Sequence, residues 1–549
     1  MTTNLTGRLR AAGLGVLAAA GGVAVGELIA AAVRPAAGPL VAVGGAVIDA
    51  TPTPVKEFAV RSLGTWDKPV LLGSIGLVVA VFAGVLGVLA ARRRWIGVAG
   101  AVLLGVAGSV AAASRPAASA FDVVPSLVAA AVAGVVLTWV LSPSGRLWTL
   151  SSSGRLWTTL RNRRTGALRS SPPTGAAWRG PGQRIAGSAV RQARGPSRVL
   201  VDRRAFLRAA GVIAGGAAVA GGGAAVVGRA RGGAITESRA AIRFPAPADP
   251  AKALPTGVGP GFVTPNGGFY RVDTALTVPR IDVGTWRLRV HGMVGRELEL
   301  SFADLLERPL IERDVTLNCV SNEVGGPYIG TARWLGVPLA PLLREAGVDP
   351  GADQLVARSD EGMTIGTPVA TVLDGRDAML CVGMNGEPLP LEHGFPVRML
   401  TPGLYGYAGA CKWLTDLELT TFADFDAYWV RRGWAARGPV KTASRIDRPQ
   451  PFAQLNGKPV TIAGVAWAQG RGIKAVEVRV DDGPWQHADL LPVPSTDTWV
   501  QWRLAWTPEA GPHTLTVRAT DRTGAVQTEA RATPFPSGAT GWHTITVTG

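Results

Sequence analysis

The sequence predicts a multi-domain chain in three structural parts: an α-helical transmembrane region, a mixed α+β region and an all-β sandwich. Three observations predict this order. Long uncharged apolar runs fill residues 1–141, strand and helix patterns alternate from about residue 263, and short strands recur at regular spacing after about residue 440. A chain of 549 residues is also too long for one hydrophobic core, so several domains are expected.

Four apolar runs predict a four-helix transmembrane region over residues 1–141, because each is near the ~20 residues that span a bilayer as helix. They are Ala11–Val33, Val70–Ala91, Ile96–Ala113 and Val123–Leu141. Buried helices of a soluble protein are the alternative, which four such runs in succession disfavour. Arginines precede the first run, separate the second from the third and follow the fourth, which predicts that these connections face the cytoplasm.

The net charge of +17 is concentrated in residues 142–208, which predict a basic cytoplasmic linker. Fourteen arginines and one acidic residue, Asp202, fall in this range, among many Ser, Gly and Pro residues. The part of the chain after Arg208 is close to neutral. The charge therefore indicates membrane topology and not binding to nucleic acid.

A fifth hydrophobic segment is predicted over residues 209–228. Arg203 and Arg204 precede it, and with the following Phe206 and Leu207 they resemble a twin-arginine export signal. A plain fifth transmembrane helix is the alternative. Both interpretations place residues beyond about Arg229 outside the cytoplasm, beginning with a Pro/Gly-rich linker over 229–262.

Two extracytoplasmic domains are predicted after this linker. Over 263–430, Trp286–Gly292 and Glu297–Leu300 show strand patterns and Ser301 is typical of a helix N-cap. Over 431–549, short strands alternate with Gly-containing turns, which is typical of an immunoglobulin-type sandwich. The clearest of these strands are Ala475–Val480, Trp499–Ala505 and Thr514–Ala519.

Cys319 is the most informative of the three cysteines. It ends a β-rich run that begins at Thr316 and then breaks into small and polar residues. A thiol at a strand end can meet a metal or an electrophile, although an ordinary core thiol is the commoner case for a single cysteine. Cys381 and Cys411 are interpreted as core thiols, with a disulfide between them as the alternative. The sequence has no haem-attachment or zinc-ligand spacing.

An ordered series of motifs resembles the sulfite oxidase family of molybdenum enzymes. The series consists of Phe269–Thr274, Thr316–Asn322, Ala332–Leu339, Met384–Pro390, His393–Arg398, Pro402–Gly406 and Cys411–Leu414. The last hundred residues resemble the immunoglobulin-like dimerisation domain of that family. The transmembrane region lies outside the resemblance.

The resemblance implies a molybdenum–molybdopterin cofactor, a pyranopterin dithiolene, whose metal takes its protein thiolate from Cys319. A soft thiolate suits a metal that must cycle between oxidation states. The residues implied in cofactor binding are Cys319, Asn322, His393, Arg398 and Lys412. The residues implied in the catalytic pocket are Cys319, Arg271, Trp334 and Trp434.

Two departures from the sulfite-oxidising members bear on the substrate. Glu323 and Val324 stand where those members carry arginines, and Trp434 stands where they carry a tyrosine. A dianion such as sulfite requires convergent cations, and these changes remove two of them and add a carboxylate. A neutral S- or N-oxide is therefore the better expectation, with a sulfite-like substrate as the other.

The predicted function is oxygen-atom transfer by a multi-pass cell-membrane protein with an extracytoplasmic catalytic domain. All five histidines follow the last membrane segment, so no haem is expected in the membrane region. Electrons are expected to pass to or from an external carrier, a cytochrome or a quinone-linked protein, and a homodimer through residues 431–549 is compatible with the resemblance. An inactive outward-facing binding or scaffold module, suggested by Glu323 and Val324, is the alternative.

Overall fold

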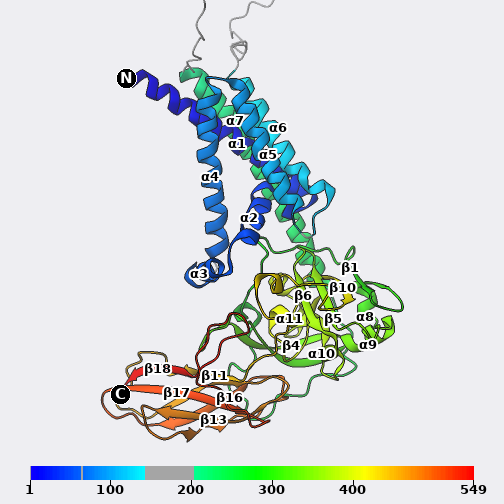
Figure 1. Ribbon diagram of the computed structural model, residues 1–549, viewed down its shortest axis with the longest axis vertical. Coiled ribbons are helices and arrows are strands. Elements are labelled where there is room, and N and C mark those ends of the chain that lie inside the picture. The colour runs from blue at the N-terminus through cyan, green and yellow to red at the C-terminus, as the bar shows by residue number, and fades with distance from the viewer. Residues whose placement is uncertain (1, 64–65, 116, 142–202) are drawn as a thin grey trace, which may run out of the picture. The chain divides into compact units, whose positions relative to one another are not determined.

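The computed structural model describes the chain except residues 1, 64–65, 116 and 142–202 (Figure 1). It divides into two units. The first unit contains Met1–Ile29, Gly73–Ser109 and Val124–Gly223, and the second contains Ala30–Leu72, Val110–Val123 and Ala224–Gly549. The predicted basic linker over 142–208 lies outside the described residues except for its last six.

Five helices in the described part of the chain are long and apolar enough to cross a membrane. They are α1 (Thr2–Val33), α4 (Asp67–Ala90), α5 (Arg94–Ala113), α6 (Val124–Val140) and α7 (Arg203–Ala241). In the first unit, α1 and α4 pack backbone against backbone, since a Cβ on Gly15 would lie 2.1 Å from the carbonyl oxygen of Ala83. Small residues that let helix backbones approach in this way are typical of membrane helix pairs.

Several helical segments were missed by the sequence patterns. Helices α2 (Pro39–Ala50) and α3 (Thr53–Leu63) follow α1, and α7 continues well into the predicted linker over 229–262. The extension of α7 is stabilised by tertiary contacts, because Ile235 packs on a hydrophobic core and Arg239 donates hydrogen bonds to the carbonyl oxygen of Leu389 and to Glu387. Residues 229–241 of the predicted linker are therefore helical.

Two β-sheets form residues 263–430, the predicted mixed α+β domain, which is named the catalytic region after that prediction. One has the order β2-β1-β10-β5-β6, in which β1 and β10 are parallel and the other pairs are antiparallel. The other has the order β3-β4-β7-β8, with β9 also paired to β7. Their strands are β1 (Arg287–Gly292), β2 (Leu298–Ser301), β3 (Ile311–Asn318), β4 (Ile329–Pro338), β5 (Gln354–Ser359), β6 (Thr364–Pro368), β7 (Met379–Met384), β8 (Glu387–Pro388), β9 (Arg398–Leu400) and β10 (Leu414–Thr420).

Short helices complete this region and enclose its main core. They are α8 (Phe302–Leu306), α9 (Leu339–Ala346), α10 (Val369–Leu373) and α11 (Gly406–Gly409), with 3₁₀ turns at Asn266–Gly268, Leu391–His393 and Val430–Arg432. Ser301 caps α8 through a capping box with Asp304, as the sequence predicts. Apolar side chains of β1, β5, β10 and α9 form one continuous core, which fixes the strand ends that carry the site.

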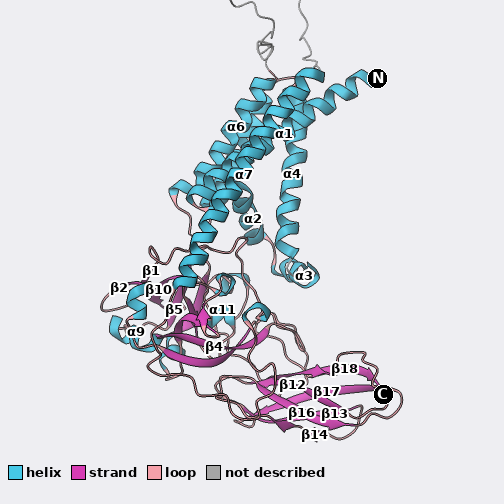
Figure 2. Ribbon diagram, turned by 180° about the vertical axis from the view of Figure 1, so that it is seen from behind, coloured by secondary structure: helices cyan, strands magenta, loops and turns pink. Residues whose placement is uncertain are grey.

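The C-terminal region consists of two four-stranded antiparallel sheets, which share a hydrophobic core. Figure 2 shows their strands near the C-terminus. The sheet orders are β11-β12-β16-β15 and β14-β13-β17-β18. The strands are β11 (Ala443–Arg448), β12 (Val460–Trp467), β13 (Ile473–Val480), β14 (Gln486–His487), β15 (Asp489–Leu490), β16 (Val500–Trp506), β17 (Pro512–Asp521) and β18 (His543–Thr548). The three strands predicted here are confirmed to within two residues. Two stacked sheets agree with a sandwich, and the immunoglobulin type remains a prediction.

A separate hydrophobic cluster joins the catalytic region to the C-terminal sheets. Phe262, Tyr405 and Trp434 pack there with Trp467 and Trp499. Trp499 also donates a hydrogen bond from its indole N–H to the carbonyl oxygen of Phe262 (3.0 Å). The segment that precedes the catalytic region is thus held between the two regions by packing and hydrogen bonds.

Candidate active site

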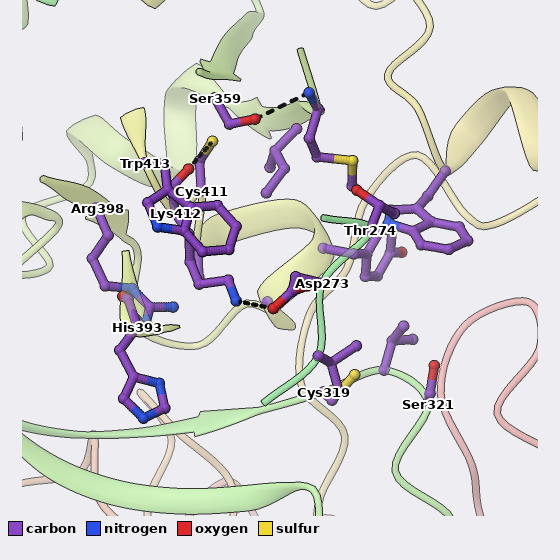
Figure 3. Close-up of a pocket in the computed structure, with 18 of the residues that line it drawn as sticks. Asp273, Thr274, Cys319, Ser321, Ser359, His393, Arg398, Cys411, Lys412 and Trp413 are labelled. Atoms are coloured by element: carbon purple, nitrogen blue, oxygen red, sulfur yellow. Dashed lines mark hydrogen bonds and ion pairs between the residues drawn. The ribbon is translucent and has the colours of Figure 1, made fainter. Parts of the chain in front are cut away.

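A cavity of about 120 Å³ lies in the catalytic region beside the end of β3. Loops from both sheets line it, and they supply two thiols, several charged groups and a group of aromatic rings (Figure 3). The lining residues used below are Tyr270, Asp273, Thr274, Cys319, Ser321, Glu361, His393, Arg398, Tyr407, Cys411, Lys412, Trp429 and Trp434.

Cys319 follows the last residue of β3, so the predicted thiol at a strand end is confirmed. Its backbone N–H donates to the carbonyl oxygen of Tyr328 (2.9 Å), and its carbonyl oxygen accepts from the N–H of Asn322 (3.0 Å). Asn322 closes the turn further, since its side-chain oxygen accepts from the N–H of Tyr328 (2.8 Å). This turn holds the thiol at the cavity wall.

Burial raises the pKa of the Cys319 thiol, while hydrogen bonds involving Ser321 and the charge of Lys412 act in the opposite direction. In the protein alone the thiol is therefore protonated at neutral pH. Ionisation of such a group requires a stronger positive charge, and a bound metal supplies one. Cys319 is therefore a thiol at the cavity wall that a bound metal would convert to a thiolate.

Three cations converge on the carboxylate of Asp273, whose side chain is only 3% exposed. Lys412 Nζ lies 2.7 Å away, Arg271 Nε 2.9 Å and Lys68 Nζ 2.6 Å. Burial alone would raise the pKa of Asp273, but these cations outweigh it and hold the pKa well below its usual range. Burial lowers the pKa of Lys412 to about 8, against the opposing influence of Asp273.

Arg398 and His393 form the second polar group of the pocket. Arg398 is 6% exposed, donates to the carbonyl oxygen of His393 (3.2 Å) and lies 4.9 Å from the ring centre of Trp334. Its buried Nε has no hydrogen-bond partner among the described residues. Burial, aided by Arg398, lowers the pKa of His393 to about 4, so its ring is neutral. His393 Nε2 lies 3.0 Å from the carbonyl oxygen of Asn266 and must be the protonated nitrogen, because a carbonyl only accepts.

An aromatic wall closes the cavity on the side of the C-terminal region. Trp434 contacts Tyr407 and Trp429, with ring centres 6.0 and 6.2 Å apart, and Phe535 at 5.4 Å. The indole N–H of Trp434 is buried, and no described residue accepts a hydrogen bond from it. This wall therefore offers apolar surface and one unused donor.

The structure brings together only some of the residues that the sequence assigns to the site. Cys319, His393, Arg398, Lys412 and Trp434 all line the cavity. Arg271 does not line the cavity but is paired with Asp273, which does, and Trp334 is fully buried with its ring against Arg398. Asn322 shapes the turn after Cys319, and Glu323 and Val324 line a separate small cavity with Asn322.

Sequence reasoning did not single out Asp273, Glu361, Thr274 or Lys68. Asp273 and Thr274 stand inside a motif that carries the resemblance, so that motif could have indicated them. Lys68 is the second residue of α4 and Glu361 stands in the turn between β5 and β6, and neither sequence pattern indicates a functional residue. All three cysteines are free and buried, which confirms Cys381 and Cys411 as core thiols.

Comparisons with known proteins match the part of the chain that contains this site. A family model described as the oxidoreductase molybdopterin binding domain matches residues 275–429. Mitochondrial sulfite oxidase of Mus musculus is 34% identical over 275 residues, which cover 42% of this chain and 50% of that protein. The oxidoreductase YuiH of Bacillus subtilis is 33% identical over 157 residues, covering 29% of this chain and 76% of that protein. The sulfane dehydrogenase SoxCD from Paracoccus pantotrophus shares 26% identity with a TM-score of 0.44, over 48% of this chain and 74% of that chain.

The site and these matches define a molybdopterin-dependent oxidoreductase. The chain belongs to the family of oxidoreductases with a molybdopterin binding domain, and its catalytic region resembles sulfite oxidases. It spans about half the length of the mammalian sulfite oxidases that it matches.

The residues present fit this cofactor. The unpartnered Nε of Arg398 and the cations around Asp273 suit an anionic pterin phosphate, and Cys319 suits the metal. In the part of the chain that the structure describes, no group of three or more His, Cys, Asp or Glu side chains could hold a metal by itself. A metal bound in this cavity would therefore need ligands from the dithiolene in addition to the thiolate of Cys319.

Proposed function

We propose that the chain is a membrane-anchored molybdenum oxidoreductase that exchanges an oxygen atom with a small neutral substrate of the S- or N-oxide type. The main support is the composition of the cavity wall. The part of the wall near Trp434 is aromatic. The two lining cations, Arg398 and Lys412, fall in the part assigned to the cofactor. The other charged lining groups are the carboxylates of Asp273 and Glu361. A sulfite dianion would meet carboxylates without a free convergent cation. Sulfite-like substrates are the second candidate, favoured by the named relatives.

The proposed roles of the residues follow from their contacts. The bound cofactor supplies the two-electron oxygen-atom chemistry. Cys319 binds its metal, and His393, Arg398 and Lys412 hold the pterin and its phosphate. Trp434 donates its unused indole N–H to the oxygen of the substrate, and the aromatic wall excludes water. Trp334 acts through Arg398, whose guanidinium it supports.

The proposed topology places the catalytic region outside the cytoplasm. Support comes from contacts within the second unit, where segments that connect membrane helices touch the catalytic region. Asp49, between α1 and α4, accepts a hydrogen bond from the hydroxyl of Tyr428 (2.6 Å), and Lys68 reaches Asp273. Segments in contact lie on one side of a membrane, and an even number of membrane crossings separates Lys68 from the catalytic region.

We further propose an external cytochrome or quinone-linked electron partner and dimerisation through residues 431–549.

Cofactor analysis and a substrate screen test the proposed function. The purified full-length protein should contain about one molybdenum and one pterin per chain, and with a dye as electron donor it should reduce S- or N-oxides. Absence of molybdenum and pterin would remove the proposal. Oxidation of sulfite with a dye acceptor, without turnover of oxides, would favour the second candidate. Full cofactor content without turnover of any compound would favour the inactive binding or scaffold module.

A further inference from the structure

Glu361 stands where three cavities of the second unit meet. It occupies the turn between β5 and β6, and it lines the pocket beside Cys319. It also lines two smaller cavities, of about 30 and about 10 Å³. Among the described residues, no other lines all three of these cavities.

The two smaller cavities are walled partly by segments that connect membrane helices. The larger one is lined by Asp49 and Arg115, with Tyr428 opposite them, and the smaller one by Arg34 and Arg115. A space of about 30 Å³ holds at least one water molecule, since roughly 10–15 Å³ is enough. The side chain of Asp49 is 39% exposed, so one wall of this cavity reaches solvent.

The surroundings of Glu361 suit a group that gains and loses a proton. Thr274 donates a hydrogen bond to its carboxylate (3.3 Å), which leaves most of its lone pairs open to the cavities. Burial, aided by the charge of Asp273, raises the pKa of Glu361 to about 7, against the opposing influence of Lys412, Arg115 and Thr274. The charged and titratable groups that face it across the three cavities are Arg34, Asp49, Arg115, Asp122, Tyr270, Asp273, Cys319, His393, Arg398, Tyr407, Cys411, Lys412 and Tyr428.

We propose that Glu361 relays protons between the catalytic pocket and the solvent-facing cavity at Asp49. This inference rests on the proposed function. Reduction of an oxide breaks its bond to oxygen, consumes two electrons from the external carrier and two protons, and releases water. The reverse reaction consumes water and releases two protons and two electrons. In either direction the carboxyl of Glu361 carries one proton at a time past the pocket wall.

The other ionisable groups of the pocket are less suited to this role. Asp273 is committed to three cations, and Lys412 is paired with it. His393 stays neutral because its pKa is lowered to about 4 by burial, and burial raises the pKa values of Tyr407 and Cys411 to about 12. A relay works best with a pKa near the working pH.

The kinetic test compares Glu361→Gln with the wild type in the loaded, full-length protein. Gln keeps the size of the side chain and removes the titration, so we expect kcat for oxide reduction to fall about 10²-fold, with KM within about twofold. In the wild type, activity should fall as the pH rises through about 7, because the protonated carboxyl is the donor. Glu361→Gln should lose this limb of the pH profile, and Glu361→Asp should retain it. Asp360→Asn is the matched control, since the Asp360 carboxyl lines none of the three cavities.

Infrared difference spectroscopy gives an independent readout during chemical reduction of the bound cofactor. The wild type should show a carboxyl band that changes on reduction, and Glu361→Gln should lack it. Wild-type kinetics and pH profile in Glu361→Gln, or the same band in both proteins, would overturn the relay. Failure of the wild type to turn over any oxide would remove the proposed function instead, and the infrared comparison would still decide the relay.

Discussion

Arg398 is a buried cation with few hydrogen-bond partners among the described residues. A guanidinium can donate five hydrogen bonds, yet the buried Arg398 makes one to the carbonyl oxygen of His393, and its Nε has no described acceptor. An unpaired buried cation destabilises a protein, so an anion bound beside Arg398 would stabilise the fold. The ring of Trp334 holds the guanidinium in place without supplying negative charge.

Arg398→Met should therefore lower cofactor content several-fold without lowering the melting temperature of the cofactor-free protein. The substitution removes an uncompensated buried charge and keeps most of the side-chain volume. Arg398→Lys should retain an intermediate content, because an ammonium keeps the charge but loses the planar fork. Molybdenum and pterin assays measure the content. Wild-type content in Arg398→Met would show that Arg398 does not contact the cofactor.

Cys319→Ser should lower turnover by about 10³-fold or more, and the protein should still fold. A hydroxyl is a harder ligand with a much higher pKa, so it cannot replace a thiolate on a redox metal. Circular dichroism and thermal unfolding check the fold, and the dye-linked assay checks turnover. Cys381→Ala is the control, since the Cys381 thiol is buried in the core and does not line the cavity. Robust activity in Cys319→Ser would show that another group binds the metal.

At the scale of elements, Gly336 fixes how β4 meets β7. A Cβ at this position would lie 2.3 Å from the carbonyl oxygen of Leu380, which is backbone and cannot move aside easily. Gly336→Ala should destabilise the protein by about 1–3 kcal/mol through overpacking. Gly267→Ala is the control, because nothing lies within 4 Å of its Cβ position. Thermal unfolding of both variants measures the difference, and equal melting temperatures would show that the strands can separate locally.

Elements with a strong local signal could be predicted from the sequence, and elements held by tertiary contacts could not. The apolar runs behind α1, α4, α5 and α6 and the N-cap at Ser301 carry their own periodicity or chemistry. The last turns of α7 are polar and glycine-containing, and they are helical because Ile235 and Arg239 find partners in the catalytic region. Helices α2 and α3 are too short and too interrupted to stand out.

The same distinction holds for the site. Cys319, His393, Arg398 and Lys412 lie in ordered motifs, so the sequence could indicate them. Lys68 reaches Asp273 from a segment 205 positions earlier in the chain, and only the folded structure brings the two side chains together. The role proposed for Glu361 depends on the cavities around its side chain, and no local sequence pattern predicts those cavities.

At the scale of the whole molecule, the export signal can be tested with the full chain. A reporter fused after Gly549 should be external in the wild type. If Arg203 and Arg204 form a twin-arginine signal, changing both to Lys should leave the reporter in the cytoplasm, whereas a plain membrane helix tolerates Lys because the positive charge is kept. An external reporter in both proteins would remove the export signal and keep the anchor. A cytoplasmic reporter in the wild type would overturn the topology.

Asp273 has a consequence for the order in which the protein is assembled. Lys68, Arg271 and Lys412 against one carboxylate leave two positive charges uncancelled at this corner of the pocket. A phosphate monoester carries about −1.5 to −2 charges at pH 7, which is close to that surplus. With the proposed cofactor, Asp273 would keep the three mutually repelling cations together before the phosphate binds, and the phosphate would neutralise the remaining charge.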